Sequence, residues 1–242
     1  MDSRISIKLL VLIICLFFTS QVQAVMIVVP GANETTSGAS NQAYPFNEIL
    51  DMHYQQVYAA SEFSGVSGII TSIAFRPDEE FGGAFSTSGI DTEIRLSHTT
   101  KVPQGLSTTF SENVGADETI VFSGHLSLSS SGLDAFDIII DIDDLFFYNG
   151  IDNLLMEIIV FNIHDNTTQF DSAGTALGVG GLLTTDRLWA WDVNATTGSS
   201  DGDDGYITQF NINPVPEPAT MLLLGSGLIG LAGYGRKKFF RK

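Results

Sequence analysis

The sequence predicts an all-β domain, either an antiparallel β-sandwich or a jelly-roll-like fold, and three observations favour it. Apolar and polar residues alternate with period two: residues 90–97 carry Ile90, Ile94 and Leu96, and residues 119–129 continue the pattern. Gly, Ser, Asn and Asp fill the segments between such stretches, as expected for turns. No internal repeat with a period of about 20–50 residues is evident, which excludes a solenoid.

These stretches divide the chain into about nine or ten short strands with polar turns, a pattern typical of antiparallel sandwiches. One helix remains an option over residues 45–60, although its apolar periodicity is poor. In chain order, the predicted strands are residues 25–29, 56–63, 68–75, 90–97, 119–129, 136–142, 154–163, 184–193 and 206–212.

The length of the chain fits one domain between two terminal segments. Of 242 residues, the first 24 and the last 29 differ in character from the rest. We therefore expect a terminal segment over residues 1–24, a β ectodomain over residues 25–213 and a second terminal segment over residues 214–242. The middle part has roughly 190 residues, about the size of one domain, and buries enough surface to fold without disulfides.

The middle part is strongly acidic. Between residues 25 and 214 there are 26 acidic residues and four basic ones, a formal charge of −22, and the basic ones are Arg76, Arg95, Lys101 and Arg187. Nucleic acids bind through cationic contacts to phosphate, so a nucleic-acid partner is excluded. Divalent cations, basic proteins and neutral sugars are compatible partners, and solubility alone is the simpler interpretation of the charge.

The N-terminal segment has the three parts of a secretory signal peptide. Arg4 and Lys8 precede an unbroken apolar run over residues 9–18, and the polar residues that follow end in a small-residue cleavage site at Ala24. The apolar run is too short to span a bilayer stably. The chain's one cysteine, Cys15, lies in this run, so the mature protein would contain no disulfide and no cysteine-based metal site. We expect export through the Sec machinery.

The C-terminal segment joins two prolines, an apolar stretch and a basic cluster. Pro216 and Pro218 flank Glu217, and because proline continues neither a helix nor a strand, this part should be extended and accessible. An uncharged stretch of 14 residues follows over 221–234, shorter than the roughly 20 residues that a spanning helix prefers. We predict a single hydrophobic helix; a buried C-terminal helix is the alternative.

Positive residues stay on the cytoplasmic side of a membrane, so the cluster after the apolar stretch places the folded domain outside. The predicted hydrophobic anchor consists of Met221, Leu222, Leu223, Leu224, Leu228, Ile229 and Leu231. The predicted basic stop consists of Arg236, Lys237, Lys238, Arg241 and Lys242.

The Pro216-Glu217-Pro218 motif, the short Gly-rich apolar stretch and the terminal basic cluster together resemble the PEP-CTERM sorting signal. The resemblance covers about 28 residues, together with an N-terminal signal, and its three-part combination is specific. It implies that a membrane-embedded exosortase recognises the motif, that the inner membrane holds the tail transiently, and that the protein then reaches the cell surface or an exopolysaccharide matrix.

Five stretches of the middle part resemble an uncharacterised all-β ectodomain found in proteins with such sorting signals. This similarity implies secretion and a sandwich, and it implies no reaction. The stretches are residues 54–63, 73–76, 106–110, 113–117 and 121–124.

Two acidic clusters are candidate calcium sites, because calcium takes six to eight oxygen ligands. Asp201, Asp203 and Asp204 fall within five residues, without the glutamate that closes an EF-hand loop. An Asx/Gly turn between strands explains them equally. The second cluster is Asp137, Asp141, Asp143 and Asp144, and in a strand the first three share one face. These carboxylates either bind a cation jointly or form a face that is only solvated. No other cofactor is expected.

Aromatic and catalytic patterns leave the chemistry open. Trp189 and Trp191 share one strand face, where indoles either bind sugar rings or, as we favour, fill the core. The four histidines, His53, His98, His125 and His164, are scattered without metal-ligand spacing. No nucleophile elbow, phosphate-binding loop or dinucleotide fingerprint is present. With 26 acidic residues in the middle part, carboxylate pairs at glycosidase spacing arise by chance.

We therefore expect an exported, non-enzymatic component of the cell surface or biofilm matrix, with a structural or carbohydrate-binding role. A secreted hydrolase that acts on polysaccharide is the alternative. A third possibility is a membrane protein that keeps its tail permanently.

Overall fold

The computed structural model describes residues 23–46, 50–132, 135–161, 167–174, 183–200, 205–215 and 226–227. Residues Ala24–Pro214 form one compact unit. All strand pairs described in this unit are antiparallel, and its only helical segments among the described residues are short 3₁₀ turns. The all-β, antiparallel prediction is confirmed.

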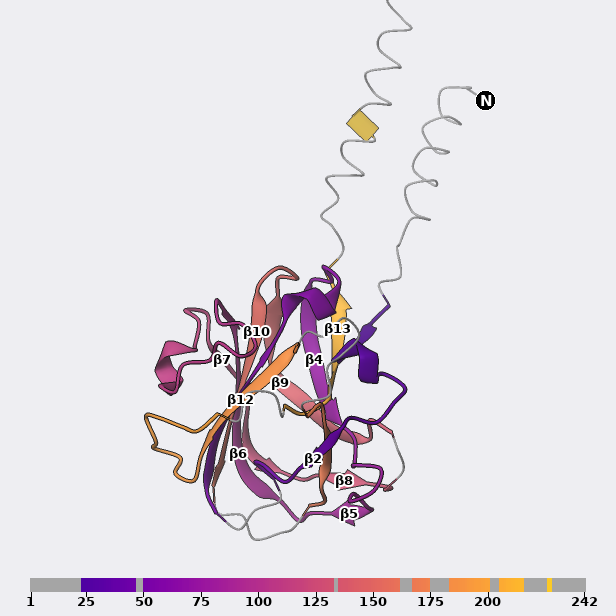
Figure 1. Ribbon diagram of the computed structural model, residues 1–242. Coiled ribbons are helices and arrows are strands. Elements are labelled where there is room, and N and C mark those ends of the chain that lie inside the picture. The colour runs from indigo at the N-terminus through magenta and orange to yellow at the C-terminus, as the bar shows by residue number, and fades with distance from the viewer. Residues whose placement is uncertain are drawn as a thin grey trace, which may run out of the picture. The chain divides into compact units, whose positions relative to one another are not determined.

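Two larger sheets form the body of this unit (Figure 1). The four-stranded sheet has the order β1-β13-β4-β9 and the five-stranded sheet the order β12-β3-β10-β6-β7. The first consists of β1 Val25–Val29, β13 Thr208–Pro214, β4 Gly68–Phe75 and β9 Ile138–Tyr148. The second consists of β12 Thr185–Ala190, β3 Met52–Tyr58, β10 Asn153–Phe161, β6 Ile90–Thr99 and β7 Thr119–Leu126.

Two small sheets and three 3₁₀ turns complete the described elements. β11 Phe170–Ser172 pairs with β2 Ser40–Gln42, and β5 Phe85–Ser86 pairs with β8 Ser129–Ser130. The turns are η1 Gly31–Asn33, η2 Ala60–Phe63 and η3 Phe110–Glu112.

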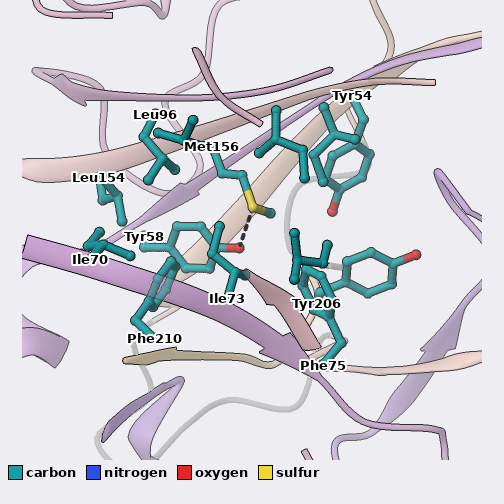
Figure 2. Close-up of a cluster of buried hydrophobic side chains, with 14 of the residues drawn as sticks. Tyr54, Tyr58, Ile70, Ile73, Phe75, Leu96, Leu154, Met156, Tyr206 and Phe210 are labelled. Carbon is teal, nitrogen blue, oxygen red and sulfur yellow. Dashed lines mark hydrogen bonds between the residues drawn. The ribbon is translucent and has the colours of Figure 1, made fainter. Parts of the chain in front are cut away.

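Both larger sheets contribute to one hydrophobic core (Figure 2). Tyr58 and Met156 of the five-stranded sheet lie beside Ile73 and Phe210 of the four-stranded sheet. The Tyr58 and Phe210 rings meet edge to face with centroids 4.9 Å apart. The Tyr58 hydroxyl lies 2.9 Å from Thr208 Oγ1, so the core accommodates this polar group without leaving it unpaired.

Several predicted strands agree closely with the structure. Residues 25–29 and 68–75 match β1 and β4 at both ends, and strands predicted at 90–97, 154–163 and 206–212 overlap β6, β10 and β13. The predictions at 119–129, 136–142 and 184–193 overlap β7, β9 and β12 with shifted ends.

The region before β4 corrects two expectations. The helix option over residues 45–60 is wrong, because Met52–Tyr58 form β3. The strand predicted over residues 56–63 starts too late and runs too far, since Ala60–Phe63 form the turn η2. All seven residues of β3 are buried, so no exposed face produces a clear alternation.

The predicted terminal elements fall mostly outside the described residues. Of the segment predicted as a hydrophobic helix, only Ser226 and Gly227 are described, and both are helical and exposed. Among the residues that the structure describes, no helix has the length and apolar character needed to cross a bilayer.

Candidate functional site

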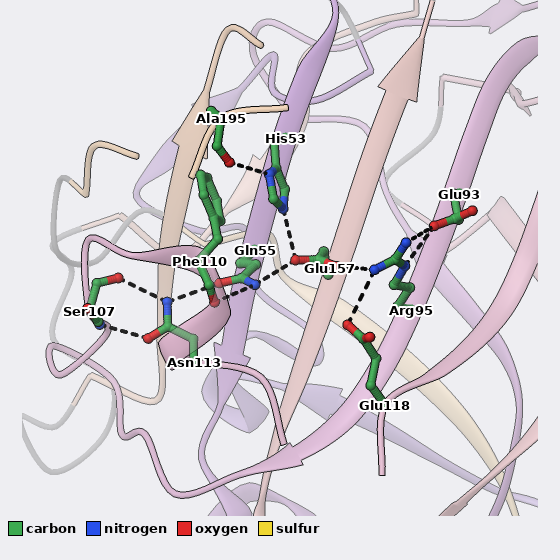
Figure 3. Close-up of polar contacts among 10 residues, drawn as sticks. All are labelled: His53, Gln55, Glu93, Arg95, Ser107, Phe110, Asn113, Glu118, Glu157 and Ala195. Carbon is green, nitrogen blue, oxygen red and sulfur yellow. Dashed lines mark hydrogen bonds and ion pairs between the residues drawn. The ribbon is translucent and has the colours of Figure 1, made fainter. Parts of the chain in front are cut away.

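The outer face of the five-stranded sheet carries a row of buried polar side chains (Figure 3). In the strand register, Glu157 of β10 lies opposite Gln55 of β3 on one side and Arg95 of β6 on the other. His53 stands two residues from Gln55 on β3 and therefore on the same face. Four polar groups from three strands thus meet on a face that points away from the core.

Two loops cover this row and leave His53, Gln55 and Glu157 at most 8% exposed. The loop between β6 and β7 lays the Phe110 ring parallel to the His53 ring, with centroids 3.7 Å apart. The loop after β12 places the Ala195 carbonyl oxygen 3.3 Å from His53 Nδ1. Backbone hydrogen bonds join the two loops, from Phe110 N to Thr196 O at 3.1 Å and from Gly198 N to Thr108 O at 2.8 Å.

Glu157 is the centre of the cluster. Its Oε1 accepts hydrogen bonds from Gln55 Nε2 at 2.7 Å and from His53 Nε2 at 2.8 Å, and its Oε2 lies 3.4 Å from a terminal nitrogen of Arg95. Burial by itself would raise the pKa of Glu157, but these hydrogen bonds and the charges of His53 and Arg95 outweigh it. The pKa therefore lies below its ordinary value, and the carboxylate is held ionised.

Two acceptors lie against the ring of His53. Nδ1 faces the Ala195 carbonyl oxygen, and Nε2 faces the carboxylate of Glu157. These contacts fix the orientation of the ring. The pair with Glu157 is a nearly buried ion pair, with side chains 10% and 6% exposed.

A chain of amides connects the cluster to the first loop. Asn113 Nδ2 donates to Gln55 Oε1 at 3.0 Å and to Ser107 O at 2.9 Å, while Ser107 N donates to Asn113 Oδ1 at 2.8 Å. Asn113 is 1% exposed. Its hydrogen bonds are therefore internal to the protein, and they hold the backbone of this loop in place against the sheet.

Arg95 links the buried row to the solvent. Its Nε donates to Glu93 at 2.7 Å, and one terminal nitrogen lies 3.6 Å from Glu118 as well as near Glu157. Burial would lower the pKa of Arg95, but these three glutamates raise it, so the guanidinium is firmly charged. The side chains of Arg95 and Glu118 remain about one third exposed, at 29% and 32%.

An open pocket of about 700 Å³ lies over this exposed end of the cluster. Arg95, Glu118 and Glu157 supply its polar wall, and Val114, Ile159 and Val193 supply an apolar one. A pocket with mostly apolar walls and a few fixed polar groups is the usual form of a small-ligand site.

The tryptophan pair does not form a flat platform. Trp189 is half-buried against the core and Trp191 is 38% exposed, and their rings meet at 75°. Tyr44 packs against both, with ring centroids 5.0 Å from Trp189 and 4.8 Å from Trp191. Trp189 thus packs partly into the core, as we favoured, while Trp191 lies outside the core cluster and is partly exposed.

The carboxylates of the second calcium candidate do not gather into one group in the part of the chain that the structure describes. No group of three His, Cys, Asp or Glu side chains within them is arranged to hold a metal ion. Asp137 instead accepts hydrogen bonds from Ser130 and Ser131, at 2.7 to 2.8 Å. The pairing of β9 with β4 shifts register beyond Asp141, which breaks the regular alternation of its carboxylates.

The other predicted site residues lie at the ends of the described chain or beyond it. Ala24, the predicted cleavage residue, is exposed and immediately precedes β1. The calcium candidates Asp201, Asp203 and Asp204, the Pro216–Pro218 motif, the hydrophobic anchor from Met221 and the basic stop from Arg236 lie outside the described residues.

Comparison with known families identifies the C-terminal segment. A family model described as the PEP-CTERM protein-sorting motif matches residues 214–237. The chain carries a PEP-CTERM sorting motif. The match includes Pro216, Glu217 and Pro218, and it stops before Lys238. Searches of curated proteins and of solved structures give no match.

The PEP-CTERM motif confirms the resemblance drawn from the sequence, and it has a functional consequence. It implies an extracellular protein that an exosortase sorts, with export and membrane anchoring before processing. The matched segment covers a small part of the chain, so the role of the ectodomain must be argued from its own residues.

Sequence reasoning did not find the cluster, although one signal pointed to it. Between residues 25 and 214 there are only four basic residues and 26 acidic ones, so a buried arginine is expected to pair with a nearby carboxylate. Arg95 marks the cluster, and Arg76 marks a second buried ion pair, 2.7 Å from Asp171.

Proposed function

We propose that the ectodomain is a non-catalytic, saccharide-binding module of an exosortase-sorted protein at the cell surface or in the biofilm matrix. The pocket over Arg95 and Glu118 is the observation that carries the proposal. A sugar presents hydroxyl groups that both donate and accept hydrogen bonds, and a fixed guanidinium beside a fixed carboxylate offers the matching donors and acceptors. The apolar wall complements the C–H face of a sugar ring.

The charge state of Glu157 favours binding over hydrolysis. Glu118 and Glu157 both lie within 3.6 Å of the same Arg95 nitrogen. Because a glycosidase needs two neighbouring carboxyl groups, this pair makes a polysaccharide hydrolase the second candidate. A glycosidase needs one carboxylic acid with a raised pKa as proton donor. The pKa of Glu157 is instead lowered, and Arg95 occupies the space between the two carboxylates.

The proposed scaffold is a β-sandwich, because the two larger sheets contribute to one core. The proposed partners are the Sec machinery and the exosortase during export, the inner membrane transiently, and an extracellular polysaccharide afterwards. Calcium at Asp201, Asp203 and Asp204 remains part of the proposal only as an optional aid to binding.

Retention of the exported protein on immobilised matrix polysaccharide tests this function. We expect retention of the wild type, weaker retention of Glu118→Gln, and no release of reducing ends from the polysaccharide. Parallel runs with added calcium and with a chelator separate a calcium-dependent mode from a calcium-independent one. Absence of retention in both runs would contradict binding, and release of reducing ends that Glu118→Gln abolishes would favour the hydrolase.

A further inference from the structure

A second hollow, of about 510 Å³, adjoins the pocket over Arg95. The two hollows share Val114, Gly115 and Ala116 in their walls, so they lie next to each other at this segment. We call residues 114–116 the saddle. Each hollow is within the size range of about 300–1,000 Å³ that is usual for small-ligand sites.

The saddle passes close to β6 and is held there at both ends. On one side, the Asn113 carbonyl accepts a hydrogen bond from Thr99 Oγ1 at 2.6 Å. On the other, the Asp117 carboxylate accepts one from His98 N at 3.1 Å. A Cβ atom at Gly115 would stand 1.8 Å from the His98 carbonyl oxygen, so only glycine permits this close approach.

The saddle carries no charged side chain. Its two side chains, Val114 and Ala116, are small and apolar, and both reach solvent at least in part. A ligand that fills one hollow therefore meets no bulky or charged side chain at the saddle on its way to the other.

The far hollow is lined by exposed acidic residues that also accept hydrogen bonds from Ser107, His98 and Asn149. Glu112, Asp117 and Asp152 contribute carboxylates, and Thr100 contributes an exposed hydroxyl. With Glu118 in the first hollow and a formal charge of −22 between residues 25 and 214, this surface repels anionic chains and suits neutral ones.

We propose that the two hollows are consecutive subsites for one extended, neutral oligosaccharide chain that crosses the saddle. This inference rests on the proposed function and specifies its ligand as a linear polymer segment rather than a single sugar. Two linked subsites bind a chain more tightly than either binds its own sugar, because the second contact is intramolecular.

A length ladder of neutral β-linked glucan, mannan and N-acetylglucosamine oligosaccharides, from disaccharide to octasaccharide, tests the proposal on the exported protein by calorimetry. We expect affinity to rise about tenfold or more once the chain is long enough to fill both hollows, and then to level off. An oligogalacturonate ladder of the same lengths should bind more weakly, since its carboxylates meet those of the protein.

Two variants separate the subsites. Thr100→Trp fills the far hollow from an exposed position, so it should abolish the gain with length and leave disaccharide affinity unchanged. Glu118→Gln alters the first hollow and should weaken every member of the ladder. Equal affinity for all lengths, or a length gain that survives Thr100→Trp, would overturn the inference while leaving the saccharide-binding function intact. No binding by any member would remove both.

Discussion

At its strands β3 and β10 the five-stranded sheet is buried on both faces, but different forces bury the two. On the inner face, Tyr58 and Met156 pack against the other sheet through apolar area, which is non-directional and tolerant of small changes. On the outer face, His53, Gln55 and Glu157 are covered by two loops and satisfied by directional contacts. A buried polar cluster tolerates loss of one member poorly, because the remaining members lose their partners.

The largest expected effect is therefore on the outer face, at its central carboxylate. Glu157→Leu leaves His53 and the guanidinium of Arg95 without their shared partner, so the free energy of unfolding should fall by about 3–5 kcal/mol. Chemical denaturation followed by fluorescence measures this change. The matched control is Glu118→Leu, whose carboxylate contacts the same Arg95 from a partly exposed position and should cost about 1 kcal/mol or less. Similar losses in both variants would contradict the distinction between buried and exposed partners.

A smaller effect is expected where the cluster holds its covering loop. Asn113→Ala leaves Gln55 Oε1 and the Ser107 backbone without their partner, which should cost about 1–3 kcal/mol. Hydrogen exchange should accelerate first at residues 107–116, with the inner-face strands protected until global unfolding.

The control for this loop is Glu112→Ala, an exposed neighbour that should change stability by no more than about 0.5 kcal/mol. Faster exchange throughout the five-stranded sheet in Asn113→Ala, rather than in the loop alone, would show that the loop and the sheet do not open separately.

The two faces should also differ in their response to acid. The pKa of Glu157 is lower in the folded chain than its ordinary value of 4.5. The ionised carboxylate therefore stabilises the fold at pH values above 4.5, and this stabilisation is lost as the pH falls through the folded pKa. The stability difference between the wild type and Glu157→Gln should thus be constant near neutral pH and narrow in acid below the ordinary pKa. Denaturation at a series of pH values measures it. A difference that widens in acid would mean that Glu157 is protonated in the folded protein.

The contrast between the faces also explains how much the sequence alone could predict. β1 and β4 were located at both ends, because Pro30 follows the first and Gly68 opens the second. β3 was misplaced, because His53 and Gln55 look like solvent-facing residues and in fact lie under loops. Burial by a loop that returns from a distant part of the chain leaves no local periodicity.

The site was less predictable than the fold for a related reason. Gln55 and Glu157 come together across 102 residues of sequence, and only the strand register makes them neighbours. Three short strands, β2, β5 and β11, were also missed, and β8 was merged in part with the strand predicted at residues 119–129, since two or three residues carry no detectable alternation. The sorting motif was recognisable because it is contiguous and works by local sequence rather than by tertiary contact.

The smallest effect is expected at the residue that the sequence made most conspicuous as a sugar platform. Trp191 is partly exposed and meets Tyr44 and Trp189 edge to face, so Trp191→Ala removes two aromatic contacts worth about 0.5 kcal/mol each and no part of the pocket over Arg95. We expect its thermal midpoint to fall by a few degrees at most and its retention on polysaccharide to equal that of the wild type. Glu118→Gln, measured beside it, should show the opposite pattern of nearly unchanged stability and weakened retention. Loss of retention in Trp191→Ala would place the binding surface at the end of β12, and the outer-face cluster would then serve only to hold its loops.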